Sequence, residues 1–157
     1  MYFIIVSVGK QELYLVRDAK VVHEYPVSTS KFGTGNKEGS NKTPLGLHRI
    51  VSKIGKNAKR GEIFKARRRI GKIAHSAGKA KEDLITTRIL RLQGLERGVN
   101  KGTGIDSFAR HIYIHGTPQE HLVGKPASHG CIRMKNSDIK ALFEQVPRGT
   151  FVLITGM

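Results

Sequence analysis

Short apolar segments separated by turn-forming residues dominate this sequence and restrict it to a mainly β fold. Residues 2–8 are rich in isoleucine, valine and aromatic residues, and apolar residues then alternate with polar ones up to residue 22. The residues Gly9-Lys10 and Asp18-Ala19-Lys20 between these segments are suited to turns. The first 27 residues are therefore predicted to form a meander of three short strands.

Further strands are predicted at residues 45–51, 84–92, 111–115 and 150–155. Residues 28–43 are poor in apolar side chains and are predicted to form a loop that ends at the turn Thr43-Pro44-Leu45-Gly46, because proline restricts φ and glycine permits positive φ. The total is about seven or eight strands, with further glycine-rich loops between them. No internal repeat or low-complexity tract is present.

One amphipathic helix is predicted at about residues 137–146, where apolar residues recur at helical spacing and build a single stripe. The stripe consists of Ile139, Leu142, Phe143 and Val146. Asn136 or Ser137 is expected to cap the start of the helix, and Pro147 is expected to end it.

The chain is strongly basic, with 28 Lys or Arg residues against 12 Asp or Glu residues. Its 157 residues suit one domain, and a net charge of +16 favours anionic partners, namely nucleic acid, acidic membrane surfaces or cell-wall polymers. Residues 53–81 hold eleven of the Lys and Arg residues and one acid, Glu62. We interpret this segment as a solvated insertion or as an anion-binding arm. Its centre, residues 65–69, is predicted to be a helix or a loop.

Cys131 is the only cysteine, so the chain cannot form an intrachain disulfide bond. The apolar run at the N-terminus is too short for a signal peptide and lacks a basic start. No apolar stretch approaches the length of a membrane span. Either the protein is not exported, or an export signal has been removed from this chain.

The segment from His115 to Met134 carries the chemistry. The run His115-Gly116-Thr117-Pro118 is followed, after a spacer, by Ser128-His129-Gly130-Cys131. A thiol attacks carbonyl groups as the thiolate, so it needs a neighbour that takes its proton, and histidine is the usual base. Small residues beside the nucleophile let backbone N–H groups approach the developing oxyanion. The pattern indicates a cysteine nucleophile with a histidine base.

Two other interpretations of these residues are open. A single cysteine is most often a small buried apolar residue, although this one is flanked by polar residues. A metal site is also conceivable, but only one thiolate is present and the two-cysteine spacing of structural zinc sites is missing. The residues that could contribute metal ligands are His111, His115, His121, His129 and Cys131. We expect no metal and no cofactor.

The chain resembles the L,D-transpeptidase catalytic domain, also called the YkuD-type domain, in its run Ser128-His129-Gly130-Cys131-Ile132-Arg133 and in its run Ile114-His115-Gly116-Thr117. The N-terminal strands, the turn at residues 43–46 and the closing helix and strand are also similar. The resemblance covers most of the chain, and residues 53–81 are its least typical part. It implies a β-sandwich of mixed sheets with one helix and a catalytic loop, in a single domain over residues 1–157.

The resemblance also implies catalytic roles for particular residues. Cys131 matches the nucleophile, and His115 matches the general acid/base that accepts the thiol proton. The backbone carbonyl of Gly116 is expected to orient the imidazole of His115. His129 is expected to shape the loop and to assist the thiolate.

The remaining site residues belong to the loop around the nucleophile. The backbone N–H groups of Gly130 and Cys131 are the candidates for the oxyanion hole, and Ser128 belongs to the same loop. Arg133 is expected either to bind a substrate carboxylate or to brace the loop.

The implied reaction is thioester formation on a peptidoglycan tetrapeptide stem with release of D-alanine, followed by transfer to an amine to give a 3→3 cross-link. Water as the acceptor gives L,D-carboxypeptidase activity instead. A non-catalytic binder of wall polymer or nucleic acid is the alternative from another class, but the basic run lacks the aromatic residues of a base-stacking surface. The expected partners are peptidoglycan stem peptides and anionic wall polymers, with no nucleic acid and no membrane span. We expect a monomer in the periplasm or cell wall.

Overall fold

The computed structural model describes residues 1–75 and 83–157, and within these ranges it contains a ten-stranded sheet, one α-helix and one short 3₁₀ helix. The strands are β1 (Tyr2–Ser7), β2 (Glu12–Arg17), β3 (Lys20–Pro26), β4 (Gly46–Ile54), β5 (Glu62–Lys65), β6 (Arg68–Ile73), β7 (Ile85–Gly94), β8 (Tyr113–Gly116), β9 (Ile132–Met134) and β10 (Phe151–Thr155). The 3₁₀ helix η1 spans Glu120–Leu122, and the helix α1 spans Asn136–Gln145.

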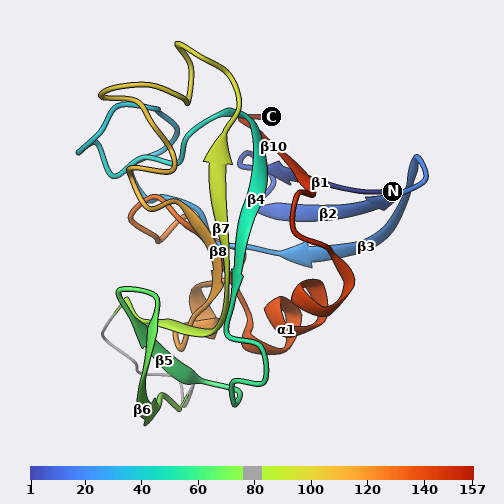
Figure 1. Cartoon of the computed structure of the whole chain (residues 1–157), viewed down its shortest axis with the longest axis vertical. Coiled ribbons are helices and arrows are strands. Elements are labelled where there is room, and N and C mark those ends of the chain that lie inside the picture. The colour runs from blue at the N-terminus through green and yellow to red at the C-terminus, as the bar shows by residue number, and fades with distance from the viewer. Residues whose placement is uncertain (76–82) are drawn as a thin grey trace.

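The strands pair in the order β3-β2-β1-β10-β4-β7-β5-β6, and β8 lies off this path, between β7 and β9. Strand β10 pairs in parallel with β1 and antiparallel with β4, so it joins the N-terminal meander to the long strands. In Figure 1, β1–β3 run across the view, whereas β4 and β7 run along its long axis. The predicted mainly β class with mixed strand pairing and one helix is confirmed, and β10 makes the strands one continuous sheet.

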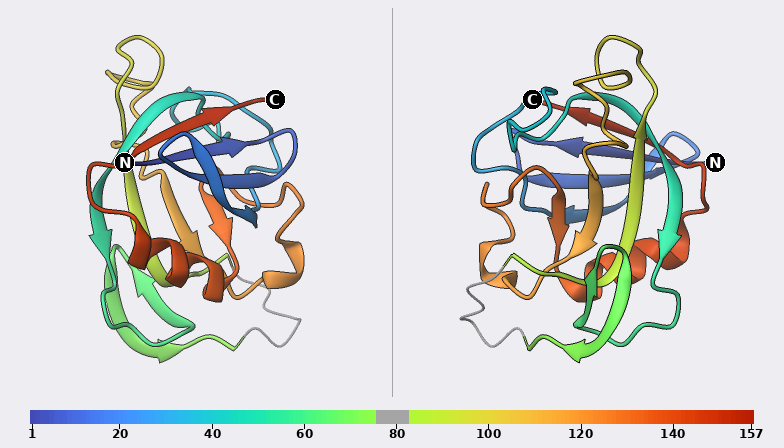
Figure 2. Two further views of the ribbon diagram at one scale, coloured as in Figure 1. Left: turned by 90° about the vertical axis from the view of Figure 1, so that its right-hand side faces the viewer. Right: turned by 60° about the vertical axis from the view of Figure 1, so that its left-hand side comes forward.

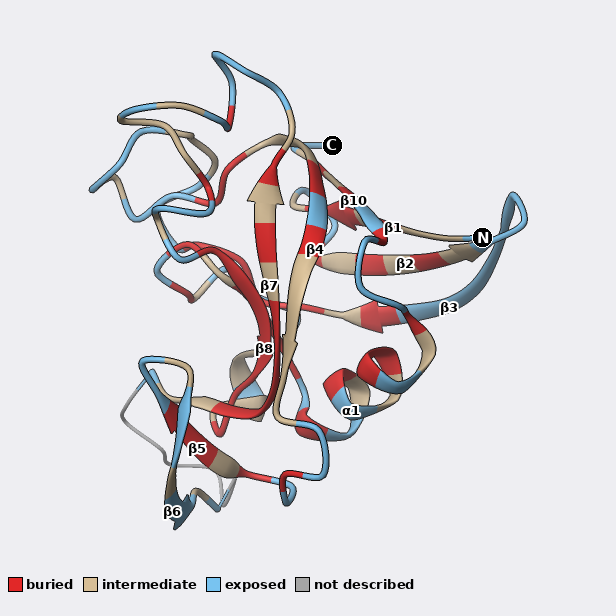
Figure 3. Cartoon of the chain, viewed as in Figure 1, coloured by how far each residue is buried: buried red, intermediate tan, exposed pale blue. Residues whose placement is uncertain are grey.

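The main core lies where the meander, the long strands and α1 meet. Every second residue of β1 and β2 is fully buried there, namely Ile4, Val6, Leu13 and Leu15, together with the apolar stripe of α1. Figure 2 shows α1 packed against one side of the strands, and Figure 3 shows the buried residues concentrated along β7 and β8. Strand β8, which carries His115, is buried along its whole length.

The start of α1 differs from the prediction. The N-cap residue is Lys135, and its side chain makes no capping hydrogen bond. Instead, the carboxylate Oε2 of Glu120 in η1 accepts a hydrogen bond from the backbone N–H of Asn136 at 2.8 Å. The side chain of Asn136 is buried and bonds to Thr86, Thr87 and Thr117. The expected cap by Asn136 or Ser137 was therefore wrong, because a carboxylate distant in the sequence occupies the helix N-terminus.

The centre of the basic segment is a β-hairpin and not the predicted helix or loop. Strands β5 and β6 pair antiparallel, and the two turn residues Ala66 and Arg67 have φ values of 47° and 65°. Positive φ at both positions is typical of the tight turns that join hairpin strands. Ile63 and Phe64 of β5 are buried, whereas β6 is largely exposed. Residues 76–81 of the segment lie outside the described residues, and its status as an insertion stays a prediction.

Two strand predictions also need adjustment. Strand β8 begins at Tyr113, two residues later than predicted, and β9 was not predicted at all, because three residues carry too little periodicity. Within residues 1–75 and 83–157, no helix is both long and apolar enough to cross a membrane.

Candidate active site

Strand pairing places the predicted nucleophile and base on one face of the sheet. Strand β9 runs parallel to β8 with His115 opposite Arg133, and Cys131 directly precedes β9. Because side chains alternate between the faces of a strand, Cys131 lies on the same face as Arg133 and His115. The two predicted catalytic residues are thus diagonal neighbours across adjacent strands.

The thiol group of Cys131 makes its hydrogen bonds with the backbone of the segment that enters β8. The Tyr113 N–H donates to Sγ at 3.3 Å, and Sγ donates to the carbonyl oxygen of His111 at 3.4 Å. Among the described residues, no hydrogen bond links Sγ to the imidazole of His115, although a base that accepts the thiol proton is expected to lie within hydrogen-bonding reach of it. The reason is the diagonal placement, which leaves Cys131 beside Tyr113 rather than beside His115.

The imidazole of His115 is held in one tautomer. Its side chain is buried, and Nδ1 lies 2.6 Å from the carbonyl oxygen of Gly116. Because a carbonyl only accepts hydrogen bonds, Nδ1 carries the proton and Nε2 keeps its lone pair. The expected contact with the Gly116 carbonyl is therefore present. A side chain at Gly116 would collide with the Thr86 carbonyl and Asn136, so only glycine fits there.

Both groups are neutral near physiological pH. Burial lowers the pKa of His115 to about 4. Burial also raises the pKa of the Cys131 thiol to about 11, and this effect outweighs the hydrogen bond from Tyr113 and the nearby charge of Arg110, which lower it. Burial therefore favours the neutral thiol and the neutral imidazole over a resting thiolate–imidazolium pair.

Asp83 joins two of the predicted site residues. Its Oδ2 atom lies 2.8 Å from Nδ1 of His129, and its Oδ1 atom accepts a 2.8 Å hydrogen bond from Nη1 of Arg133. Burial alone would raise the pKa of Asp83, but the hydrogen bond from His129 and the charge of Arg133 lower it overall. Asp83 is a site residue that the sequence did not predict, since no motif surrounds it and its partners are distant in the chain.

The guanidinium group of Arg133 is buried and already bonded. It is 1% exposed, and besides Asp83 it donates to Oε1 of Gln119 at 2.7 Å and to Oγ of Ser28 at 3.4 Å. A cation enclosed in this way cannot readily pair with a substrate carboxylate. Of the two expected roles of Arg133, the geometry favours bracing the loop.

The loop before Cys131 is held by hydroxyl groups. Ser128 Oγ donates to the carbonyl oxygen of Cys131 at 2.7 Å and accepts from the Gly130 N–H at 3.3 Å. Thr43 Oγ1 donates to the carbonyl oxygen of Gly130 at 3.0 Å, and Gly130 has a φ of +130°, which favours glycine. Of the two N–H groups expected to form an oxyanion hole, that of Gly130 is engaged by Ser128. That of Cys131 makes no hydrogen bond with any described residue.

Cys131 lines a cavity of about 460 Å³ that is open to solvent. Arg110, His111 and His129 line it as well, whereas His115 does not. Nη2 of Arg110 donates to the carbonyl oxygen of Lys42 at 2.6 Å, which fixes a cation in the cavity wall. Arg110 was likewise not predicted from the sequence, because it lies in a glycine-rich loop without a recognisable motif. This cavity suits a substrate that presents a carbonyl group to the thiol and an anionic group to Arg110.

Replacing Asp83 with asparagine is expected to destabilise the protein by about 2 to 3 kcal/mol, because the buried guanidinium of Arg133 loses the carboxylate with which it pairs. In addition, one carboxylate oxygen is replaced by an amide NH₂ group, which would face an N–H donor of His129 or Arg133. The free energy of unfolding from urea denaturation measures the effect.

The matched control is Asp18→Asn, which removes an exposed carboxylate that pairs with the N-terminal amine. It should change the unfolding free energy far less than Asp83→Asn. Equal effects from the two substitutions would contradict the role assigned to Asp83.

A family model described as the L,D-transpeptidase catalytic domain (YkuD) matches residues 1–154. The chain is 57% identical over 42 residues to the putative L,D-transpeptidase YqjB of Bacillus subtilis, a match that covers 27% of this chain and 24% of that protein. It is 56% identical over 45 residues to the probable L,D-transpeptidase YbiS of Escherichia coli K12, a match that covers 29% of this chain and 15% of that protein. These matches therefore span only a small part of each curated relative.

Solved structures show the same fold. An L,D-transpeptidase from Mycobacterium smegmatis superposes with a TM-score of 0.60 at 14% identity, over 99% of this chain and 58% of that one. L,D-transpeptidase 3 from Mycobacterium tuberculosis, in complex with a faropenem-derived adduct, superposes with a TM-score of 0.60 at 18% identity, over 98% and 60%.

Proposed function

The chain belongs to the L,D-transpeptidase catalytic domain family, and on this basis we propose that it is a peptidoglycan L,D-transpeptidase with Cys131 as its nucleophile. Family membership supports the class of acyl-transferring enzymes that act on peptidoglycan peptides. The observation that carries the residue assignment is the position of Cys131. This only thiol of the chain lines an open cavity and shares a sheet face with a buried, neutral imidazole.

In the first step, Sγ of Cys131 attacks the carbonyl carbon of the third residue of a tetrapeptide stem. Nε2 of His115 takes the thiol proton as the C–S bond forms, because neither group is ionised beforehand. This step requires the two side chains to approach each other, which catalytic groups of a free enzyme often do only when substrate binds. The tetrahedral intermediate then collapses. The proton on Nε2 passes to the leaving amine, D-alanine departs, and a thioester remains.

In the second step, an amine of another stem attacks the thioester carbonyl. The amine loses a proton to Nε2 of His115, the C–S bond breaks, and the thiol of Cys131 recovers the proton. The product is a 3→3 cross-link. When water attacks in place of the amine, the same steps release a tripeptide, which is the L,D-carboxypeptidase alternative.

The surrounding residues support these steps without being consumed. The backbone N–H of Cys131 is free to donate to the oxyanion of either tetrahedral intermediate. Ser128 and Thr43 hold the loop in position, and the Asp83–His129–Arg133 cluster braces its far side. Arg110 attracts the carboxylate of a stem peptide toward the cavity. This function places the protein in the periplasm or cell wall.

The test is incubation of the protein with purified tetrapeptide muropeptides, with the products identified by mass spectrometry. Transpeptidation is expected to yield cross-linked dimers together with one equivalent of D-alanine for each link. Tripeptide and D-alanine without dimers would assign the carboxypeptidase reaction. Unchanged substrate under conditions in which the protein is folded would contradict the proposal.

A further inference from the structure

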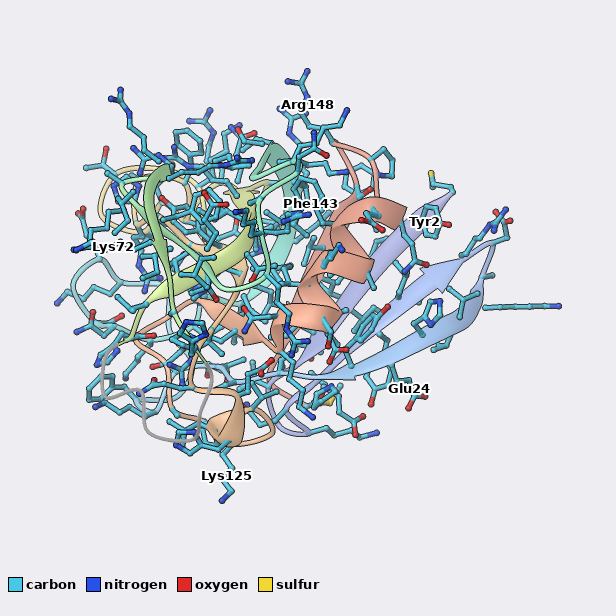
Figure 4. The ribbon with its side chains drawn as sticks, turned by 90° about the horizontal axis from the view of Figure 1, so that it is seen from below. Tyr2, Glu24, Lys72, Lys125, Phe143 and Arg148 are labelled. Carbon is cyan, nitrogen blue, oxygen red and sulfur yellow. The ribbon has the colours of Figure 1, made fainter. Side chains whose placement is uncertain are left out.

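A second cavity, of about 450 Å³, lies between the end of β4, strand β7 and the C-terminal half of α1. It shares no lining residue with the cavity at Cys131. Its lining residues are Lys53, Lys56, Asn57, Arg88, Phe143 and Glu144. Figure 4 shows this side of the molecule, with Phe143 labelled on α1. The catalytic steps proposed above use none of these residues.

Two cations of this cavity are fixed in place by the fold. Nζ of Lys53 donates to the carbonyl oxygen of Val146 at 2.8 Å and lies 4.4 Å from the ring centre of Phe143. The guanidinium carbon of Arg88 lies 5.4 Å from the same ring centre. Phe143 thus supports both cations, and their positions depend little on side-chain flexibility.

Arg88 retains donors that the described residues do not satisfy. It is 4% exposed, and its Nη1 atom donates to the carbonyl oxygens of Ala58 and Thr87, each at 2.8 Å. Its Nε atom is sealed from solvent and has no hydrogen-bond partner among the described residues, and its Nη2 atom makes no hydrogen bond with them either. A buried guanidinium with five N–H donors normally finds more acceptors than two carbonyl groups.

The charge of the cavity is unbalanced. Among its lining residues, Lys53, Lys56 and Arg88 stand against one carboxylate, that of Glu144. Burial lowers the pKa of Lys53, and the charge of Lys56 lowers it further. Burial likewise lowers the pKa of Arg88. The carboxylates of Glu144 and, outside the lining, of Glu62 raise the pKa of Arg88, and the charge of Arg69 lowers it. Each shift means that a positive charge is held there at a cost in free energy, which a bound anion would offset.

We propose that this cavity is a second binding site, which takes a phosphate group of an anionic wall polymer and so anchors the domain near its peptide substrate. Arg88 and the two lysines supply the donors and the charge that a tetrahedral oxyanion requires. Nucleic acid bases fit poorly, because Lys53 and Arg88 already contact the Phe143 ring on which a base would stack. The assignment of a wall polymer as the source of the phosphate rests on the proposed function. The presence of a phosphate site does not.

The site is tested by titrating the whole protein with inorganic phosphate and, separately, with a soluble glycerol phosphate oligomer. The salt concentration is held at about 0.15 M to screen non-specific attraction. Nuclear magnetic resonance follows the Nε–H signal of Arg88 and the backbone amide of Asn57. Saturable shifts of both signals with both ligands are the expected result. Shifts with inorganic phosphate but not with the oligomer would overturn the polymer as the source.

The double variant Lys53→Gln/Lys56→Gln is expected to weaken phosphate binding by about fivefold or more, since it removes two of the three cations. The control Lys10→Gln/Lys20→Gln removes the same charge from two exposed positions of the N-terminal meander and should bind as tightly as the unmodified protein. If the loss of Lys53 impairs folding, the single variant Lys56→Gln, at an exposed position, still tests the contribution of a cavity cation to phosphate binding. Equal affinity for all variants, or shifts spread over the β5–β6 hairpin without Arg88, would overturn the site. None of these measurements depends on acyl transfer by Cys131.

Discussion

Replacing Cys131 with alanine should abolish both product formation from muropeptides and the covalent capture of a carbapenem. No other thiol exists in the chain, so no second nucleophile of this kind can form the thioester. Intact-protein mass spectrometry after incubation with a carbapenem should show one added ligand mass on the unmodified protein and none on Cys131→Ala. Turnover should fall below detection in the variant.

The family to which the chain belongs implies acylation by carbapenems, which motivates the choice of ligand class. The control is the far-ultraviolet circular dichroism spectrum and the urea midpoint of Cys131→Ala, because a small apolar residue should be tolerated beside Ile89 and Tyr113. Full turnover by a folded Cys131→Ala protein would refute the assignment of the nucleophile.

Replacing His115 with glutamine should lower kcat/KM by about a hundredfold to ten-thousandfold, with a larger effect on kcat than on KM. Glutamine can still donate to the Gly116 carbonyl, but it cannot accept the thiol proton. Steady-state kinetics on muropeptides measure the loss. A change in KM alone would indicate that His115 only shapes the site.

The pH dependence tests the neutral state of the pair. Since burial lowers the pKa of His115 to about 4, the imidazole is a competent base above that pH, and activity should fall only as the pH drops through about 4. Since burial raises the pKa of Cys131 to about 11, alkylation of the free protein by iodoacetamide should keep accelerating up to about that pH.

Buried His48, which also has a pKa lowered by burial to about 4, provides the matched control for this experiment. Its ring bonds to Ser107 and to the Gly46 carbonyl, and it takes no part in the proposed steps. The fall in activity near pH 4 should therefore persist in His48→Gln. It should be absent from the pH profile of the residual activity of His115→Gln. A fall in activity centred near pH 6.5, or an alkylation rate that levels off near pH 7, would contradict the assignment of a neutral thiol and a neutral imidazole.

Local patterns in the sequence were enough to predict most of the elements. The short apolar segments and the turn residues between them determine the three strands of residues 2–27, and β1 and β2 each bury every second side chain, whereas β3 buries only Tyr25. The stripe from Ile139 to Val146 determines α1 for the same reason at helical spacing. The runs around His115 and Cys131 identify the family, and they contain the two groups that we propose react.

Long-range contacts decided the rest. The parallel pairing of β9 with β8 sets Cys131 diagonally from His115, the carboxylate of Glu120 caps α1, and Asp83 bridges His129 and Arg133. Each of these contacts joins residues far apart in the chain. The ionisation states of Cys131 and His115 likewise follow from burial, which depends on the packing of the whole domain and leaves no trace in local sequence.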